Sequence, residues 1–410
     1  MTVQAQSVEK VVQPLDYRAY LELVNQQNLG YAAEKLNVTV AEAQLKAARV
    51  FNDPAISVEY ADNDDRKMQM GQSLAIEVSK NFSIGTRSAN INLARSEKEL
   101  NEALLTDYFH SLRQQATLAY LEAIKQAELF RVKEDAYANM RQLAAGDSVK
   151  HRLGKITKVD ALQSKLEAEM SHNDLMQAQT ELHNAYTSLA SMTGTFSRDT
   201  LYTPTGTLQQ PKRIFEVGQL LETALANRAD LAAALKTVEV ARRALVVTRR
   251  ERYTDFDVAV GYNINTEVRN EIAPAPKFNG LTVGVAIPLK FSNLNRGALH
   301  AAEVQTKQAE INYQQAEVEV QSSVMQSLRR YLSLSEQVNR YNNGLLADAQ
   351  AVVDGKNYAY DRGQTSLLEV LHARQTYDDL RTTYIETLYE QVASLVELER
   401  NAGIWDITVE

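Results

Sequence analysis

The sequence predicts a mainly α-helical protein with a smaller β component, arranged as a tandem repeat. Three observations support this fold class. Two proline-free stretches of about 60 residues, 87–146 and 295–355, carry apolar residues every three or four positions, as one face of a helix requires. Two segments, 55–80 and 256–288, alternate in polarity around polar loops, which is the pattern of β-hairpins. The two halves of the chain also match each other in register.

The first half, residues 1–195, is predicted to begin with a short helix near 16–28 and a second helix of about 23 residues. The hairpin at 55–80, the long helix at 87–146, a reversal and a returning helix at 156–193 follow. We expect residues 196–213 to form a linker, because this stretch contains Pro204, Gly206 and Pro211.

The second half, residues 214–405, is predicted to repeat this order and to be followed by a tail at 406–410. Its elements are a short helix near 214–228, a second helix, the hairpin at 256–288, the long helix at 295–355, a reversal and a helix at 364–403. After the hairpins the two halves align at an offset of 363 − 154 = 209, and the matched pairs are Phe82 with Phe291, Arg87 with Arg296, Gly146 with Gly355, Gly154 with Gly363, and Gly194 with Gly403.

Helix length excludes a compact globule. A helix of about 60 residues spans roughly 90 Å, since each residue adds ~1.5 Å. The two shorter helices of each half, stacked end to end, match the long one in length. The simplest packing therefore lays each long helix beside a stacked pair.

The hairpins leave open strand edges, which cannot face lipid because their backbone groups would be unpaired. If the strands enter a membrane, several chains must close one barrel, and three chains with four strands each would supply twelve. The alternative that the pattern leaves open is a soluble β-layer that caps a helical bundle.

Composition excludes several function classes. Lys and Arg number 44 against 52 Asp and Glu, and a net charge of −8 without a basic stripe argues against a nucleic-acid partner. The absence of cysteine excludes disulfides and thiolate metal sites. The six histidines form no close ligand cluster, so we expect no metal site and no cofactor. There is no phosphate-binding glycine loop, nucleophile elbow or HExxH motif, so we expect no catalytic site and no enzyme.

Targeting signals are also missing from the sequence. No apolar run reaches the ~18 residues of a membrane-spanning helix, and the first residues lack the apolar core of a signal peptide. If the protein is exported, we expect its leader to have been removed.

Specific motifs indicate a family. Ala226–Leu231 (ANRADL), Val238–Leu245 (VEVARRAL) and the strand-to-helix crossing Ile287–Arg296 (IPLKFSNLNR) resemble the TolC-like outer-membrane efflux proteins. The resemblance covers nearly the whole chain. The first-half counterpart, with Asn28-Leu29, Val40–Leu45 and Asn52–Pro54, is similar to the heavy-metal Czc and Cus branch.

The resemblance implies a homotrimer whose twelve-stranded transmembrane β-barrel, with four strands per chain, lies in the lipid of the outer membrane of a Gram-negative bacterium. The barrel would continue as an α-helical barrel through the periplasm. Such a channel is the passive exit duct of a tripartite efflux system, which receives metal ions or small toxic compounds from a periplasmic adaptor (membrane fusion) protein and an inner-membrane pump of the RND type.

Two other functions remain open at this stage. One is the outer-membrane component of type I protein secretion, and the other is a soluble coiled-coil scaffold or adaptor without conductance. A trimer that requires detergent and conducts ions would distinguish a channel from a scaffold.

The two helix reversals are the candidate working site. Glycine suits such a reversal because it adopts positive φ at little cost. By position in the family motif, the reversals resemble the tips that contact the adaptor, and the residues in question are Arg152, Leu153, Gly154, Tyr360, Arg362 and Gly363.

By the same resemblance, Asp160 and Glu369 occupy places where relatives carry acids near a constricted periplasmic entrance, and His372 stands where some carry a second acid. Thr365 replaces an arginine that family members can use in a closing salt bridge. The alternative interpretation is that Asp160 and Glu369 are first-turn acids that the helix dipole favours.

Overall fold

The computed structural model describes residues 11–83, 85–194, 200–252, 255–289 and 293–406. The chain forms two compact units. Unit 1 draws on Met1–Lys35, Leu105–Leu231 and Ala316–Glu410, and unit 2 draws on Leu36–Leu104 and Ala232–Gln315. Each unit takes segments from both halves of the sequence, so the units do not coincide with the two predicted repeats.

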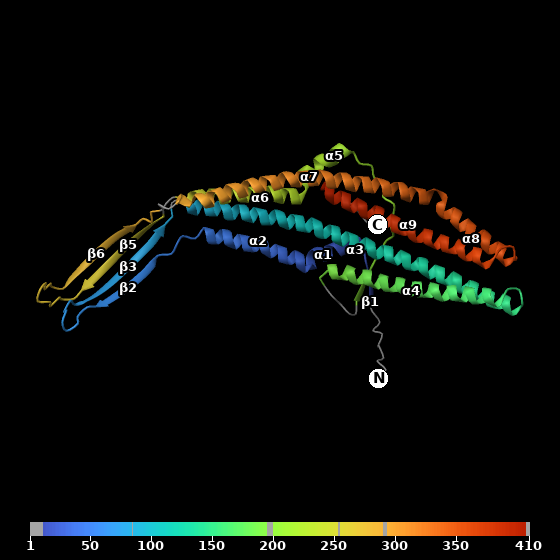
Figure 1. Cartoon of the computed structure of the whole chain (residues 1–410), viewed down its shortest axis with the longest axis horizontal. Helices are drawn as coiled ribbons and strands as arrows, with labels where there is room; N and C mark the ends of the chain where they lie inside the picture. The colour runs from blue at the N-terminus through green and yellow to red at the C-terminus, as the bar shows by residue number, and fades with distance from the viewer. Residues whose placement is uncertain (1–10, 84, 195–199, 253–254, 290–292, 407–410) are drawn as a thin grey trace, which may run out of the picture. The chain divides into compact units, whose positions relative to one another are not determined.

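Unit 2 contains a four-stranded antiparallel sheet in the order β2-β3-β5-β6 (Figure 1). The first predicted hairpin is β2 (Ala55–Asp62) with β3 (Gln72–Phe82), and the second is β5 (Phe256–Asn265) with β6 (Phe278–Ala286). Strands β3 and β5 pair with each other and so join the two hairpins. Strands β2 and β6 each have a single partner among the described strands.

Strand register gives this sheet two different faces, because directly paired residues lie on the same face. One row across the sheet is Val58, Ile76, Tyr262 and Leu281, and the next is Ile56, Val78, Val260 and Val283. The opposite face carries small or polar residues, with the rows Ser57, Glu77, Gly261, Thr282 and Glu59, Ala75, Asn263, Gly280. The apolar face is open to solvent, with Val283 66% exposed and Leu281 72% exposed.

The helices α2 (Leu29–Ala48), α3 (Thr86–Arg152), α6 (Ala229–Arg250) and α7 (Arg296–Arg340) each contribute residues to both units. Helix α3 extends beyond the predicted end at residue 146. Gly146 is an exposed interior position of α3, and the roughly 1 kcal/mol that a helical glycine costs does not end a helix that neighbouring turns continue.

The prediction of one continuous helix over residues 295–355 is wrong. Helix α7 ends at Arg340, a π-helical turn occupies Tyr341–Leu345, and α8 runs over Leu346–Asp361. Gly344 in this turn has a φ of 114°, outside the helical region. The apolar stripe passes through the turn without a gap, which is why the periodicity did not indicate it.

The remaining helices lie in unit 1. They are α1 (Tyr17–Gln27), α4 (Lys158–Met192), α5 (Val217–Asn227) and α9 (Leu367–Ala402). Their core is aromatic, since Tyr20, Tyr120 and Tyr331 are almost completely buried. The ring centroids of Tyr20 and Tyr120 lie 5.5 Å apart, a distance typical of packed aromatic pairs. No helix of the described ranges combines the length and hydrophobicity needed to cross a membrane.

The predicted linker at 196–213 is more ordered than its composition indicated. Its described part contains β4 (Thr200–Pro204), which pairs in parallel with β1 (Val11–Leu15), a strand the sequence did not predict. The Tyr120 hydroxyl donates to the carbonyls of Leu15 or Thr205, at 2.9 and 2.7 Å. Such a short parallel pair carries too little periodicity to be predicted from sequence.

Candidate functional site at the helix tips

Two helix reversals, which we call tip 1 (residues 152–157) and tip 2 (residues 362–366), connect α3 to α4 and α8 to α9. Their backbones follow the same pattern. In tip 1 the Lys155 N–H donates to the Lys150 carbonyl at 2.9 Å, and in tip 2 the Gln364 N–H donates to Ala359 at 2.9 Å. Gly154 and Gly363 have φ of 70° and 72°. Both reversals are therefore left-handed helix caps of the kind that glycine favours.

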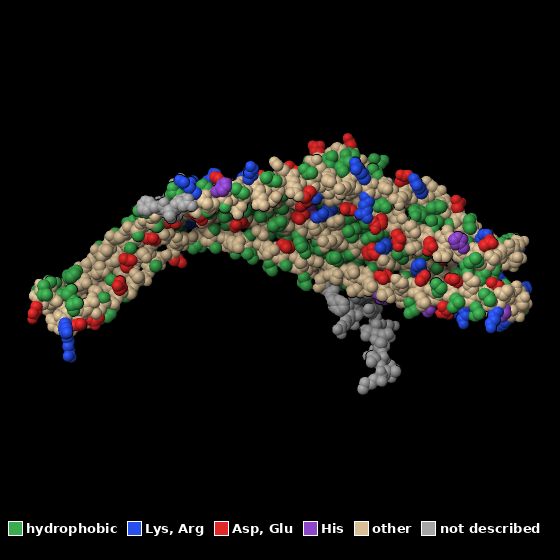
Figure 2. Space-filling view, in the orientation of Figure 1, with side chains coloured by type: hydrophobic (Ala, Val, Ile, Leu, Met, Phe, Trp, Pro, Cys, Tyr) green, Lys and Arg blue, Asp and Glu red, His purple; other side chains and the backbone are tan. Residues whose placement is uncertain are grey.

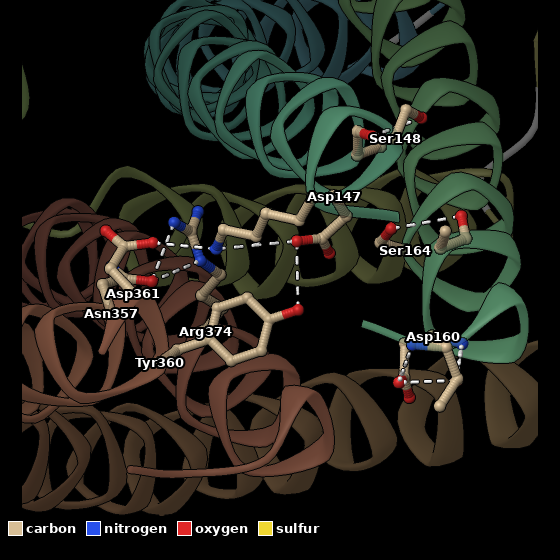
Figure 3. Close-up of polar contacts among 12 residues, drawn as sticks. Asp147, Ser148, Asp160, Ser164, Asn357, Tyr360, Asp361 and Arg374 are labelled. Atoms are coloured by element: carbon tan, nitrogen blue, oxygen red, sulfur yellow. Dashed lines mark hydrogen bonds and ion pairs between the residues drawn. The ribbon is translucent and has the colours of Figure 1, made fainter. Parts of the chain in front are cut away.

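Asp147 links the two tips (Figure 3). It lies on α3, one turn before tip 1, and its side chain is completely buried. The Tyr360 hydroxyl from α8 donates to Asp147 Oδ1 at 3.0 Å, and the ammonium of Lys150 lies 3.8 Å from the same oxygen. Asp147 Oδ2 has no hydrogen-bond partner among the described residues. The bond between Tyr360 and Asp147 thus ties α8 to α3 at the tips.

Lys150 strengthens the same contact from α3. Its ammonium lies 2.9 Å from Asp361 Oδ1 and 4.2 Å from the centroid of the Tyr360 ring. Burial and the bond to the Asp147 carboxylate both raise the pKa of the Tyr360 hydroxyl well above its usual range, so it stays protonated and keeps donating. We call Asp147, Lys150, Tyr360 and Asp361 the tip cluster.

Arg374 joins α8 to α9 behind tip 2. Its Nε and Nη2 donate to Asn357 Oδ1 at 3.2 and 3.0 Å (Figure 3). Tip 2 is therefore held on both sides, to α3 by Tyr360 and to α9 by Asn357.

Asp160 caps the helix that follows tip 1. Its carboxylate accepts from the Thr157 N–H at 3.2 Å, and the Thr157 hydroxyl accepts from the Asp160 N–H at 3.1 Å. This reciprocal pair is a capping box at the start of α4. The interpretation of Asp160 as a first-turn acid is confirmed, and its role at an entrance stays a prediction.

Glu369 makes different contacts in the first turn of α9. It binds the Lys356 ammonium of α8 and accepts from the Thr365 hydroxyl at 2.6 Å. The ammonium, and then the hydroxyl, lower the pKa of Glu369 below its usual range. Thr365 thus holds the acid itself where an arginine was a possible partner. The His372 side chain is exposed, and its carbonyl accepts from Thr376 at 2.8 Å.

The predicted adaptor-contacting residues lie on the outside of the tips. Arg152, Gly154 and Gly363 are exposed, and Leu153 is an apolar side chain that is 66% exposed. The Arg362 guanidinium lies 3.4 Å from the centroid of the exposed Tyr358 ring. Tyr360 differs from the other predicted contact residues, because its hydroxyl points inward to Asp147 (Figure 3).

Sequence reasoning missed Asp147, Lys150 and Asp361. The signal that could have found the first is a charge reversal between the twins, because Asp147 matches Lys356 at the same offset of 209 (356 − 147). In tip 2 the lysine pairs with Glu369, whereas in tip 1 both corresponding residues, Asp147 and Asp160, are acids. Two acids cannot pair with each other, so each needs another partner.

The charges of unit 1 do not gather by sign. Figure 2 shows acidic and basic side chains interspersed over its helices on the face in view. Within the described residues, no three His, Asp or Glu side chains form a group that could hold a metal ion. The tip cluster is an arrangement for contact between helices, and its groups can hold two hairpins together or release them.

Comparison with known proteins places this fold. A family model described as "Outer membrane efflux protein" matches residues 220–403. A crystal structure of CusC has a TM-score of 0.78 with 18% sequence identity, and the similarity covers 95% of this chain and 92% of that one.

Two curated proteins are similar over most of their length. The cobalt-zinc-cadmium resistance protein CzcC of Cupriavidus metallidurans is 24% identical, over 95% of this chain and 90% of its own. The cation efflux system protein CusC of Escherichia coli is 23% identical, over 93% of this chain and 84% of its own. The chain belongs to the outer membrane efflux protein family, which confirms the resemblance drawn from its motifs. A family of efflux channels also supports the expectation that the protein is not an enzyme.

Proposed function

We propose that three copies of this chain form the exit duct of a tripartite efflux system. The observation that carries the proposal is the sheet of unit 2, one face of which is apolar and exposed while both outer strands have a free edge. Exposed apolar rows suit contact with lipid, and free edges require further strands, because lipid cannot satisfy backbone groups. Four strands from each of three chains supply a closed barrel of twelve.

The opposite face of the sheet fits the interior of such a barrel. Its rows contain Glu59, Glu77 and several small residues, so that face is polar and leaves space. Acids repeated by threefold symmetry concentrate cations along the path. This agrees with a metal cation as cargo, since CzcC and CusC are named for resistance to, or efflux of, cations.

The duct would lie in the outer membrane of a Gram-negative bacterium, with its helices in the periplasm. The exposed residues of the tips are the proposed contact with a periplasmic adaptor, and Leu153 offers an apolar group for it. The adaptor in turn would connect the duct to an inner-membrane pump of the RND type.

Purification and reconstitution test this function. We expect a trimer that requires detergent and that conducts ions in a planar bilayer with cation preference. A monomer that is stable without detergent and does not conduct would refute the duct and favour the scaffold. In cells, deletion of the gene is expected to lower tolerance to divalent metals.

The first-turn acids give a prediction for the entrance. Replacing both by neutral isosteres, with Asp160→Asn and Glu369→Gln, is expected to raise single-channel conductance at low salt about twofold to fivefold, because exposed ion pairs contribute roughly 0.2–1 kcal/mol each. The matched control is Glu169→Gln, an exposed acid on α4. Unchanged conductance and ion selectivity in the double variant would exclude Asp160 and Glu369 from the entrance.

Acid should reproduce part of this effect. The pKa of Glu369 is lowered, so its bond to Lys356 is fully present above the ordinary glutamate value of about 4.3 and is lost only as pH falls through the lower folded pKa. We expect conductance to step upward below about pH 4. Lys356→Gln should move the step to higher pH, and Glu369→Gln should remove it. A step of the same size at the same pH in Glu369→Gln would contradict the assignment.

A further inference from the structure

The π-helical turn Tyr341–Leu345 breaks the long helix of the second half alone. Gly344 within it has a φ of 114°, which glycine adopts freely and other residues do not. A Cβ on Gly344 would meet nothing within 4 Å, so conformation rather than space requires the glycine. The matching position of the first half, at 344 − 209 = 135, is Asp135 inside the uninterrupted α3.

Packing is weakest at this turn. Asn342, Asn343 and Leu345 are exposed, whereas Val338 before the turn and Val353 after it are buried. A π turn also lacks the regular backbone bonding of an α-helix. Sharp changes of helix direction concentrate at such places. The helix is therefore anchored on both sides of a segment that has little to hold it.

The linker crosses this turn and bonds to both of its sides. Gln210 Nε2 donates to Asn339 Oδ1 of α7 at 2.8 Å, and Gln210 Oε1 accepts from Asn342 Nδ2 within the turn at 3.0 Å. Two residues earlier, the Leu208 N–H donates to Glu128 of α3 at 3.1 Å. We call residues 205–213 the strap.

The strap is fixed at its far end. The Arg213 N–H donates to the Tyr331 hydroxyl at 3.1 Å, and the Arg213 side chain binds Glu399 and Asp406. A glutamine held between two fixed points can restrain the turn that it bonds on both sides.

We propose that Tyr341–Leu345 is a hinge on which α8 and tip 2 move as one body, and that Gln210 is the latch that holds the hinge closed. Tip 1 has no equivalent hinge in the described part of α3, so the two tips differ in stiffness. The role of this motion at the entrance rests on the function proposed above; the motion itself does not. Tip 2 would then be the moving part and tip 1 the fixed frame against which Tyr360 and Asp147 close.

Hydrogen exchange on the purified full-length protein tests the latch. Gln210→Ala is expected to speed exchange in residues 341–361 roughly threefold to tenfold, because two hydrogen bonds across the turn are lost. Residues 132–152 of α3 should not change. The control is Gln209→Ala, an exposed neighbour, and a thermal unfolding curve verifies the fold. Equal exchange in the two variants, or equal acceleration in α3, would overturn the proposal.

Spin labels give an independent readout. The chain has no cysteine, so Lys155→Cys and Gln364→Cys introduce two exposed label sites, one on each tip. We expect the distance distribution between the labels to broaden in Gln210→Ala and to stay narrow in Gln209→Ala. An unbroadened distribution would refute the hinge. A broadened distribution with unchanged conductance would confirm the hinge and refute its role at the entrance.

Discussion

Val283→Arg is expected to prevent stable insertion of the protein into the outer membrane. Val283 lies near the middle of β6 on the apolar face, in the row with Ile56, Val78 and Val260. An arginine that faces lipid near the bilayer centre costs ~2–4 kcal/mol, and a trimer carries it three times, so the total is roughly 6–12 kcal/mol. The measurement is the amount of trimer in the membrane fraction, with a decrease of at least tenfold expected.

The matched control is the adjacent residue of the same strand. Thr282 lies on the opposite, polar face, so Thr282→Arg should insert nearly normally and lower cation conductance instead, because its charge faces the path. Its only described bond, from Asn263 Nδ2 at 3.0 Å, is exposed and contributes little. If both variants insert equally well, the apolar face does not contact lipid.

Tyr360→Phe is expected to weaken the closed arrangement of the tips. The substitution removes one hydroxyl, and with it the 3.0 Å bond to the buried Asp147, while the ring that Lys150 contacts stays in place. A hydrogen bond to a charged group contributes about 1.5–3 kcal/mol, so the ratio of open to closed tips should rise roughly tenfold to a hundredfold. Open probability in single-channel recordings measures this ratio.

Tyr358→Phe serves as the control for that experiment. Tyr358 is an exposed tyrosine two residues away, and its ring, which carries the contact with Arg362, is retained. Asp147→Ala should have a larger effect than Tyr360→Phe, because it removes the buried carboxylate from both Tyr360 and Lys150. Equal open probabilities for Tyr358→Phe and Tyr360→Phe would show that the tip cluster does not hold the channel closed.

The candidate site was predictable in part. The twin glycines at 154 and 363 indicated two reversals, because few other residues adopt positive φ, and both reversals are present. The acids at 160 and 369 could be placed in first turns, but their partners could not. Lys356 reaches Glu369 from another helix, and Asp147 reaches Tyr360 across more than two hundred residues of sequence. Such pairs depend on how helices pack, which a periodic pattern does not specify.

The hinge shows the same division within a single helix. Asn343-Gly344 is a weak breaker in sequence, and Gly146 and Gly355 are comparable glycines that leave their helices intact. The turn at Gly344 was invisible to periodicity because it is an arrangement of the backbone, and the strap that bonds to it comes from a segment that composition classed as a linker.

Sequence alone determined the helical and β segments of this protein, the two hairpins, the two reversals and the family, because these follow from local periodicity, turn chemistry and motif. Only the tertiary structure decided that β3 and β5 join the hairpins into one sheet with a single apolar face, that Asp147 ties the tips together, and that Gln210 bonds across the π turn. The physical reason is that strand register and contacts between helices depend on the packing of distant segments, whose free energy no local pattern records.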